Sequence, residues 1–302
     1  MNSIKKMMLS GALGCLISGM AYADGSSPQP VKPYWQDIQV VAVNKEKPRS
    51  SFMSYADRET ALTSRFEKSP YYSLLNGTWK FFFVDSYKDL PQNITDPSVN
   101  TSSWDDITVP GNWEVQGHGV AIYTNHGYEF KPKNPQPPLL PEANPVGVYR
   151  RDIEIPANWD NRDIYLHIGG AKSGLYVYLN GKEVGYSEDS KNPAEFLINK
   201  YLQPGKNVLT LKIFRWSTGS YLECQDFWRM SGIERDVFLW SQPKASIQDF
   251  RVVSTLDDTY TNGIFKLAVD LKNHTQETKN LNVGYELLDA KGNLMASEAN
   301  DI

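Results

Sequence analysis

Short runs of the β type recur through the middle of the chain, and those at 149–155 and 208–214 alternate between apolar and polar residues. The runs lie at residues 78–84, 149–155, 163–168, 175–179, 182–186, 208–214 and 236–240. Turn pairs such as Asn76-Gly77, Asn180-Gly181 and Pro204-Gly205 separate several of them, and Asn-Gly between two such runs is a strong hairpin signal. No sustained helical period interrupts the series. The pattern predicts an antiparallel β-sandwich of the jelly-roll kind over residues 58–241.

A second set of alternating runs follows Pro243, at residues 247–255, 264–271 and 281–288, with a turn at 290–293 leading into a fourth. Phe265, Leu267, Val269 and Leu271 fall on one face of their run. An immunoglobulin-like sandwich needs about seven strands and roughly 100 residues. We therefore expect residues 242–302 to be a partial, truncated immunoglobulin-like domain and the whole chain to be all-β.

The first 23 residues have the pattern of an export signal. Lys5 and Lys6 precede an apolar stretch at 7–20, and Ala21-Tyr22-Ala23 fits a small-x-small cleavage site. The stretch is too short for a membrane span, so an exported, periplasmic or extracellular protein is expected. A lipid anchor on Cys15 is the alternative, although cutting there would leave a very short apolar region. Residues 24–57 are rich in proline and are expected to run extended over the surface.

Composition narrows the range of partners. The net charge is −4, which disfavours nucleic acid because phosphate binding needs a basic surface. The chain has 2 cysteines, and removal of the signal would leave Cys224 alone. Cys224 can then form no internal disulfide and no cysteine metal cluster.

Residues 214–237 are unusually rich in Trp, Tyr and Arg for a loop, and they include the run Asp226-Phe227-Trp228-Arg229-Met230-Ser231-Gly232. Five further landmarks precede this block in the chain: Leu74-Leu75-Asn76-Gly77-Thr78-Trp79-Lys80-Phe81, Val109-Pro110-Gly111-Asn112-Trp113-Glu114, Ile122-Tyr123-Thr124-Asn125, Asn144-Pro145-Val146-Gly147-Val148-Tyr149-Arg150-Arg151 and Gly185-Tyr186-Ser187-Glu188-Asp189-Ser190. In this order and spacing, residues 58–253 resemble the N-terminal region of the β-galactosidases of glycoside hydrolase family two.

The resemblance implies a retaining exo-glycosidase acting on terminal β-galactosides. It implies a galactose-binding-like jelly roll first, an immunoglobulin-like domain second and a catalytic barrel third. Both catalytic glutamates would lie in the barrel, beyond residue 302, and the family's Asn-Glu dipeptide is missing from this sequence. No catalytic residue is therefore assigned, and the 302-residue chain is expected to be inactive alone. Sodium, magnesium and a homo-oligomer are expected for the full-length enzyme.

Two positions carry over from the family's motifs as substrate-binding residues. Asn125 matches an asparagine that reaches into the barrel's pocket, where its amide can donate to and accept from sugar hydroxyls. Asp189 matches an aspartate that binds a sugar hydroxyl and a sodium ion, so it would form a partial sodium site. Local backbone capping is the alternative role for both residues. His126 departs from the family pattern beside Asn125, where an apolar residue is usual.

For Trp216, Tyr221, Trp228 and Arg229 the favoured role is a packed scaffold, with Arg229 pairing to Asp226 or Glu223. Stacking on a sugar is the alternative.

Two other classes of protein also fit the whole chain. One is a stand-alone carbohydrate-binding module of the same fold, and the other is a purely structural β-sandwich.

Overall fold

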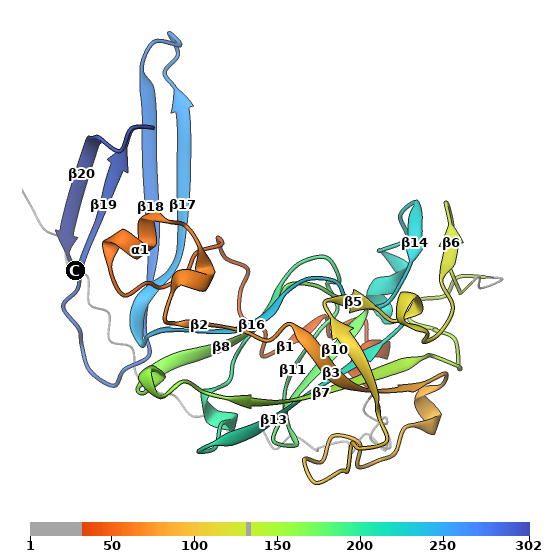
Figure 1. Cartoon of the computed structure of the whole chain (residues 1–302). Helices are drawn as coiled ribbons and strands as arrows, with labels where there is room; N and C mark the ends of the chain where they lie inside the picture. Colours follow the sequence, from red (N-terminus) through yellow and green to blue (C-terminus); the bar gives the residue numbers. More distant parts are fainter. Residues whose placement is uncertain (1–31, 131–133) are drawn as a thin grey trace, which may run out of the picture. The chain divides into compact units, whose positions relative to one another are not determined.

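The computed structural model describes residues 32–130 and 134–302, and Pro33–Ile302 form one folded unit (Figure 1). The expected signal at 1–23, with Cys15 and the cleavage site after Ala23, lies outside the described residues. Within the described ranges, no helix has the length and apolar character needed to cross a membrane.

The larger sheet has seven antiparallel strands in the order β1-β11-β10-β13-β7-β3-β4. Their bounds are β1 Ala42–Val43, β11 Lys182–Ser187, β10 Gly174–Leu179, β13 Lys206–Phe214, β7 Val146–Glu154, β3 Gly77–Val84 and β4 Asp105–Val109. Strands β10 and β11 form the hairpin expected at Asn180-Gly181. Both turn residues have positive φ, 54° and 76°, as a type I′ turn requires.

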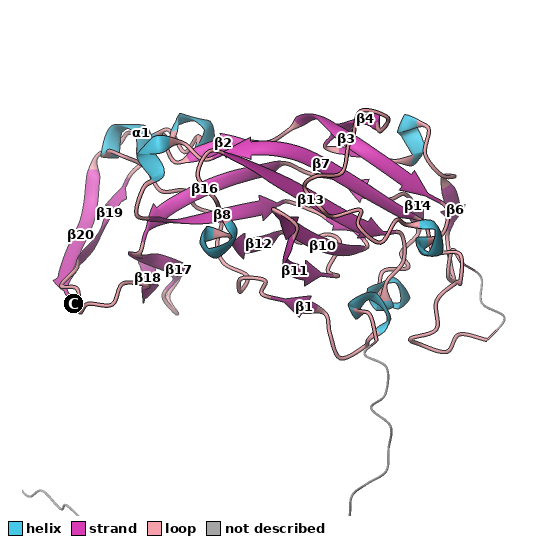
Figure 2. Cartoon of the chain, turned by 90° about the horizontal axis from the view of Figure 1, so that it is seen from below, coloured by secondary structure: helices cyan, strands magenta, loops and turns pink. Residues whose placement is uncertain are grey.

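The smaller sheet has four antiparallel strands in the order β12-β8-β16-β2 (Figure 2). They are β12 Ala194–Leu197, β8 Arg162–Ile168, β16 Val237–Pro243 and β2 Tyr72–Leu74. The domain boundary expected after residue 241 falls inside β16, which remains paired to β8 as far as Pro243.

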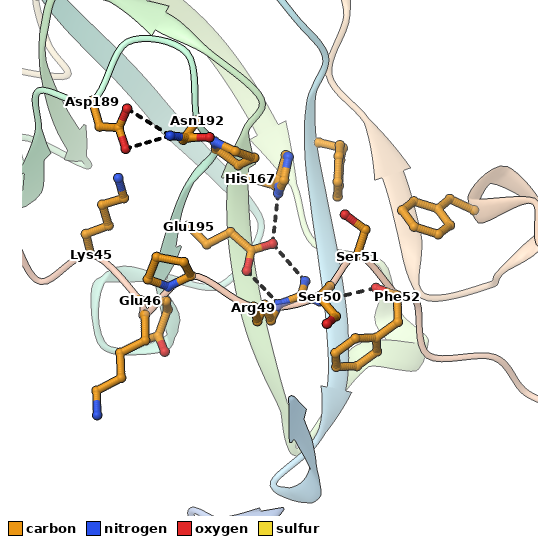
Figure 3. A pocket seen from close by; sticks show the side chains of 15 residues that line it. Lys45, Glu46, Arg49, Ser50, Ser51, Phe52, His167, Asp189, Asn192 and Glu195 are labelled. Atoms are coloured by element: carbon orange, nitrogen blue, oxygen red, sulfur yellow. Dashed lines mark hydrogen bonds and ion pairs between the residues drawn. The ribbon is translucent and has the colours of Figure 1, made fainter. Parts of the chain in front are cut away.

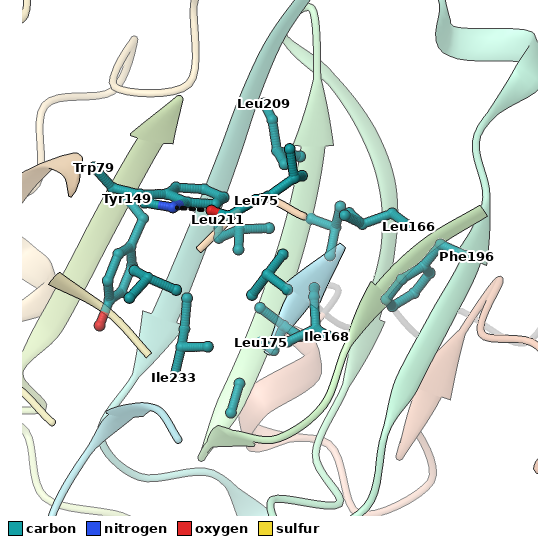
Figure 4. Close-up of a cluster of buried hydrophobic side chains, with 14 of the residues drawn as sticks. Leu75, Trp79, Tyr149, Leu166, Ile168, Leu175, Phe196, Leu209, Leu211 and Ile233 are labelled. Carbon is teal, nitrogen blue, oxygen red and sulfur yellow. Dashed lines mark hydrogen bonds between the residues drawn. The ribbon is translucent and has the colours of Figure 1, made fainter. Parts of the chain in front are cut away.

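One hydrophobic core joins the two sheets into a sandwich. Leu209 and Leu211 of β13 belong to the same buried cluster as Leu166 and Ile168 of β8 (Figure 4). Period-two alternation puts these side chains on one face of each strand. The all-β jelly-roll sandwich expected from the sequence is confirmed.

The outer face of the smaller sheet is also aromatic. Tyr165, Phe238 and Trp240 form a separate buried cluster there with Met53, which precedes the first strand of this sheet. Met53 belongs to the segment 24–57, expected to run over the surface, and Trp35 of the same segment is only 2% exposed and stacks on Phe214 at 4.9 Å. The prediction that residues 24–57 run over the surface is therefore wrong at Trp35 and Met53. Each of these side chains is buried in a hydrophobic cluster of the folded chain.

Two small sheets extend from the sandwich. β6 Ile122–Thr124 pairs with β14 Phe227–Arg229, and β15 Gly232–Ile233 lies between β5 Gly111–Asn112 and β9 Ala171–Lys172. The α-helix α1, Arg58–Leu62, begins at Asp57, whose side chain accepts from the backbone N–H of Thr60 at 2.8 Å. Short 3₁₀ turns lie at Tyr34–Gln36, Phe66–Lys68, Tyr87–Asp89, Glu114–Gln116, Ala157–Trp159, Asn199–Tyr201 and Thr218–Tyr221.

Four strands follow residue 244, as the sequence predicts. They form two hairpins, β17 Ala245–Leu256 with β18 Gly263–Asn273 and β19 Asn282–Leu288 with β20 Leu294–Asp301. Phe265 of β18 and Tyr285 of β19 bring the hairpins into contact, with ring centroids 5.5 Å apart.

Candidate functional site

Asp189 lies in the turn between β11 and β12, and its carboxylate is exposed. The Asn192 amide donates to both carboxylate oxygens, at 3.1 and 3.0 Å. This side-chain pairing differs from the local backbone capping that was considered for Asp189. It also presents the carboxylate at the edge of a pocket.

The pocket beside Asp189 encloses about 300 Å³ and is built by segments far apart in the sequence (Figure 3). Residues 45–52 form one wall, while β8, β12 and β16 contribute His167, Glu195 and Phe238. The His167 ring stacks on Phe238 with centroids 4.2 Å apart. The pocket therefore combines aromatic surface with charged and amide groups, which is the composition that recognises small polar ligands.

The Glu195 carboxylate contacts three neighbouring polar side chains. Arg49 donates to both of its oxygens at 2.9 Å, His167 Nδ1 lies 2.8 Å away and Trp240 Nε1 donates at 3.1 Å. Burial would raise the pKa of Glu195, but the His167 hydrogen bond and the Arg49 charge outweigh it and hold the pKa below its ordinary value. Glu195 therefore stays ionised and is unsuited to protonating a leaving group.

Lys45 faces Asp189 from the opposite wall (Figure 3). Its ammonium donates to Ser187 Oγ at 3.2 Å. Burial lowers the pKa of Lys45, while the negative charge of Asp189 acts in the opposite direction. Lys45 and Asp189 thus give the pocket mouth one charge of each sign.

Asp189 fits a sodium ion only as a single oxygen ligand. Its carboxylate already accepts two N–H bonds from Asn192 and faces the Lys45 ammonium, which competes with a cation for the same oxygens. The part of the chain that the structure describes holds no group of three His, Cys, Asp or Glu residues placed to bind a metal.

Asn125 lies elsewhere, directly after β6 on the two-stranded arm that β6 forms with β14. Its side chain is exposed, and its Oδ1 lies 2.8 Å from His126 Nδ1. Because an amide oxygen can only accept, the imidazole Nδ1 carries the proton and the Asn125 NH₂ group is left to donate. Asn125 is not among the residues that line the pocket beside Asp189.

The scaffold prediction for the aromatic block is confirmed at three of its four positions. Trp216, Tyr221 and Arg229 are buried. Arg229 donates to the backbone carbonyls of Glu223 and Thr124, at 3.2 and 3.3 Å. The expected pairing of Arg229 with a carboxylate of Asp226 or Glu223 is not made. Trp228 does not fit the scaffold role, because it is 52% exposed.

The sequence interpretation missed Lys45, Arg49, His167, Asn192 and Glu195. Arg49 and Glu195 are 146 positions apart, so no local spacing links them. One signal was available: Glu195 sits within the apolar run of β12, directly opposite His167 of β8. A charged residue in such a run needs a buried partner.

Residues 72–243 match the family model for the sugar binding domain of glycosyl hydrolases family 2. A β-galactosidase of Priestia megaterium is 39% identical over 262 residues, which cover 85% of this chain and 25% of that protein. A β-galactosidase of Oenococcus oeni is 42% identical over 185 residues, which cover 61% of this chain and 18% of that protein. The chain therefore spans about a quarter of the length of the first curated relatives that it matches.

Solved structures share the fold. A β-glucuronidase of Bacteroides uniformis superposes with a TM-score of 0.61 at 20% identity, covering 76% of this chain and 26% of that one. A β-glucuronidase of Ruminococcus gnavus gives a TM-score of 0.58 at 23% identity, covering 77% and 38%. Since the family model spans more than half of the chain, this protein belongs to glycosyl hydrolase family 2 and contains that family's sugar binding domain.

Proposed function

We propose that this chain is the N-terminal part of a retaining exo-β-galactosidase that removes terminal β-D-galactose from galactosides such as lactose. The main support is the similarity to proteins named β-galactosidase, at 39% identity over 85% of the chain in one case. The exposure of Asn125 and Asp189 is consistent with this proposal, because both side chains lie at the surface, where a ligand could reach them.

In this proposal the chain binds and orients substrate, and its catalytic partners come from residues beyond Ile302. Retaining hydrolysis needs two carboxyl groups about 5 Å apart, one of them with a raised pKa. Glu195 has a lowered pKa and is tied to Arg49 and His167. Asn125 would donate to a sugar hydroxyl and Asp189 would accept from one.

The remaining expectations for the full-length enzyme are also proposals. Asp189 would supply one oxygen ligand to a sodium ion, completed by residues outside this chain. Magnesium would be held wholly by such residues. The protein would be exported and homo-oligomeric.

A chimera tests the proposal directly. Residues 58–243 of this chain would replace the matching segment of the Priestia megaterium β-galactosidase, and nitrophenol release from a nitrophenyl β-galactoside would be measured. We expect activity, and we expect Asn125→Ala and Asp189→Ala each to lower kcat/KM by about tenfold or more, because each removes a hydrogen bond to substrate.

Matched controls are Asn280→Ala and Asp160→Ala in the 302-residue chain, where both side chains are exposed. They should leave folding unchanged, as Asn125→Ala and Asp189→Ala should. A folded chimera in which neither Asn125→Ala nor Asp189→Ala alters kcat/KM would refute the assigned roles.

The 302-residue chain alone should release no nitrophenol above buffer, and turnover by it would contradict the placement of the catalytic groups.

A stand-alone carbohydrate-binding module is the second candidate, because the pocket beside Asp189 is formed entirely by this chain. It predicts binding of galactose or lactose in calorimetry that is lost in Asp189→Ala. An unchanged heat signal in that variant would show that the pocket beside Asp189 is not the sugar site of such a module.

A further inference from the structure

The β6–β14 arm carries an unusual set of side chains on one face. Tyr123 and Trp228 are direct partners in the antiparallel register, so both point to the same side. Asn125 directly follows β6 and Asp226 directly precedes β14, so each lies two positions from the aromatic residue of its strand. The Tyr123 hydroxyl donates to Asp226 Oδ1 at 3.1 Å, which places Asp226 beside the aromatic pair.

Exposure separates Trp228 from every other tryptophan. The chain has 8 tryptophans, and the other seven are at most 8% exposed. Trp228 is 52% exposed and Tyr123 is 57% exposed. Their ring centroids lie 5.5 Å apart at an interplanar angle of 61°. The two rings support each other edge to face and leave aromatic surface open to solvent.

The opposite face of the arm is anchored. Phe227 lies among three cations, with Arg229, Lys191 and Lys172 at 5.0, 5.4 and 5.6 Å from its ring centroid. Arg229 is buried and donates to the Thr124 carbonyl across the strand pair. The arm is therefore held from one side, and Tyr123 and Trp228 are presented in a fixed arrangement before any ligand arrives. Such preorganisation lowers the entropic cost of binding.

We propose that Trp228 and Tyr123 form a stacking platform for a pyranose ring, with Asp226 accepting from one sugar hydroxyl and Asn125 donating to another. The C–H face of a pyranose matches an exposed indole ring, and carboxylate and amide groups beside it match the ring's hydroxyls. The inference extends the proposed function, because it assigns the face next to Asn125 to a sugar.

Two exposed rings favour a sugar over a protein partner. A stable protein interface buries about 800 Å² on each side, whereas an aromatic side chain offers about 150–250 Å² when fully buried. The carboxylate of Asp226 beside the rings also disfavours a dry protein contact, because an unpaired charge is costly to bury.

Iodide quenching of tryptophan fluorescence in the 302-residue chain tests the platform. Since Trp228 is the exposed indole, it should account for most of the quenchable signal. Lactose should protect it, with half-saturation at about millimolar concentration as expected for a small, open site. Glycerol at matched viscosity should give no protection.

Calorimetry with lactose on variants assigns the site. Trp228→Ala and Asp226→Ala should each weaken binding by about tenfold or more. Leu222→Ala is the matched control, because Leu222 is 84% exposed on the same loop and should leave binding unchanged. Circular dichroism checks that each variant is folded.

The outcomes are distinct. Lactose binding that is equal in Trp228→Ala and the parent chain overturns the platform, as does protection by glycerol. Absence of lactose binding together with self-association that Trp228→Ala abolishes would also overturn it in favour of a protein contact. Binding that is lost in Trp228→Ala but kept in Asp189→Ala supports the platform independently of whether the chimera hydrolyses galactosides.

Discussion

The jelly-roll sandwich and the two hairpins after residue 244 are both β-structure, yet they differ in what stabilises them. The sandwich encloses a large core in which Phe81 and Leu211 are fully buried. No residue between Ala245 and Ile302, all of which the structure describes, is buried. The run that contains Phe265 of β18 alternates more regularly than the run that contains Phe81 of β3, but Phe265 makes only a partly exposed contact with Tyr285.

The difference shows that alternation predicts strands and not cores. Pairing along β17 and β18 extends over eleven register positions, although each of these strands is paired along one edge only. Burial of an apolar face requires a second sheet. The sandwich has one, whereas each hairpin is a two-stranded sheet, and Phe265 and Tyr285 make one contact between the two hairpins.

The largest expected effect is on the free energy of unfolding, and it is seen by comparing substitutions of two phenylalanines. Phe81→Ala should lower the free energy of unfolding by about 3–5 kcal/mol, because it leaves a cavity among Trp113, Tyr149 and His118. Phe265→Ala should cost less than about 1.5 kcal/mol, since little of its surface is removed from water. Urea unfolding followed by circular dichroism measures both. Equal losses would mean that the hairpins share the cooperative core.

An intermediate effect on stability is expected from the ion pair between Arg49 and Glu195 in the pocket. Glu195→Gln should lower stability at neutral pH by about 3 kcal/mol, because Arg49 loses its buried partner. The folded pKa of Glu195 lies below its ordinary value of 4.5, so its contribution is present above that pH and is lost as the pH falls through the lowered value. The parent chain should therefore lose stability more steeply than Glu195→Gln between about pH 5 and pH 3.

Asp257→Asn in the β17–β18 turn is the control for this titration. Hydrogen bonds from Asn262 and Thr261 lower the pKa of Asp257 as well, but Asp257 is not buried. Thermal unfolding across the pH series measures all three proteins. A pH profile that Asp257→Asn flattens as much as Glu195→Gln would show that burial is not the source of the difference.

The smallest effect concerns a link between the two regions. Arg58 of α1 donates from Nε to Glu286 of β19 at 3.0 Å, and both side chains are about half exposed or more. A double-mutant cycle with Arg58→Ala and Glu286→Ala should give a coupling below about 1 kcal/mol, because solvent screens the pair. Raising the salt concentration should reduce it further. A larger, salt-resistant coupling would show that the hairpins are docked more firmly than their exposure suggests.

Local pattern was sufficient to predict most of the strands and the Asn180-Gly181 hairpin, because both depend on neighbours in the chain. Asp189, which lies at a pocket edge, was selected through the family resemblance and not through local pattern. Arg49, His167 and Glu195 could not be found from local pattern, since their contact depends on how β8 pairs with β12 and on where residues 45–52 cross the sheet. Trp228 illustrates the same limit: Arg229 beside it is buried and Phe227 is partly buried, and only the folded structure shows that Trp228 itself is exposed.

Strand β1 has a consequence for the solution behaviour of the protein. It covers only two residues of β11, and the Asn44 side chain then donates to the Val184 carbonyl at 2.9 Å, occupying the next acceptor along that border. At Gly185 an added Cβ would lie 2.3 Å from the Val43 carbonyl oxygen, so the close approach depends on glycine. Proteolytic removal of residues before 58 would uncover the backbone of β11 and leave an edge on which another molecule could add a strand. The N-terminal segment thereby protects the folded chain against edge-to-edge aggregation.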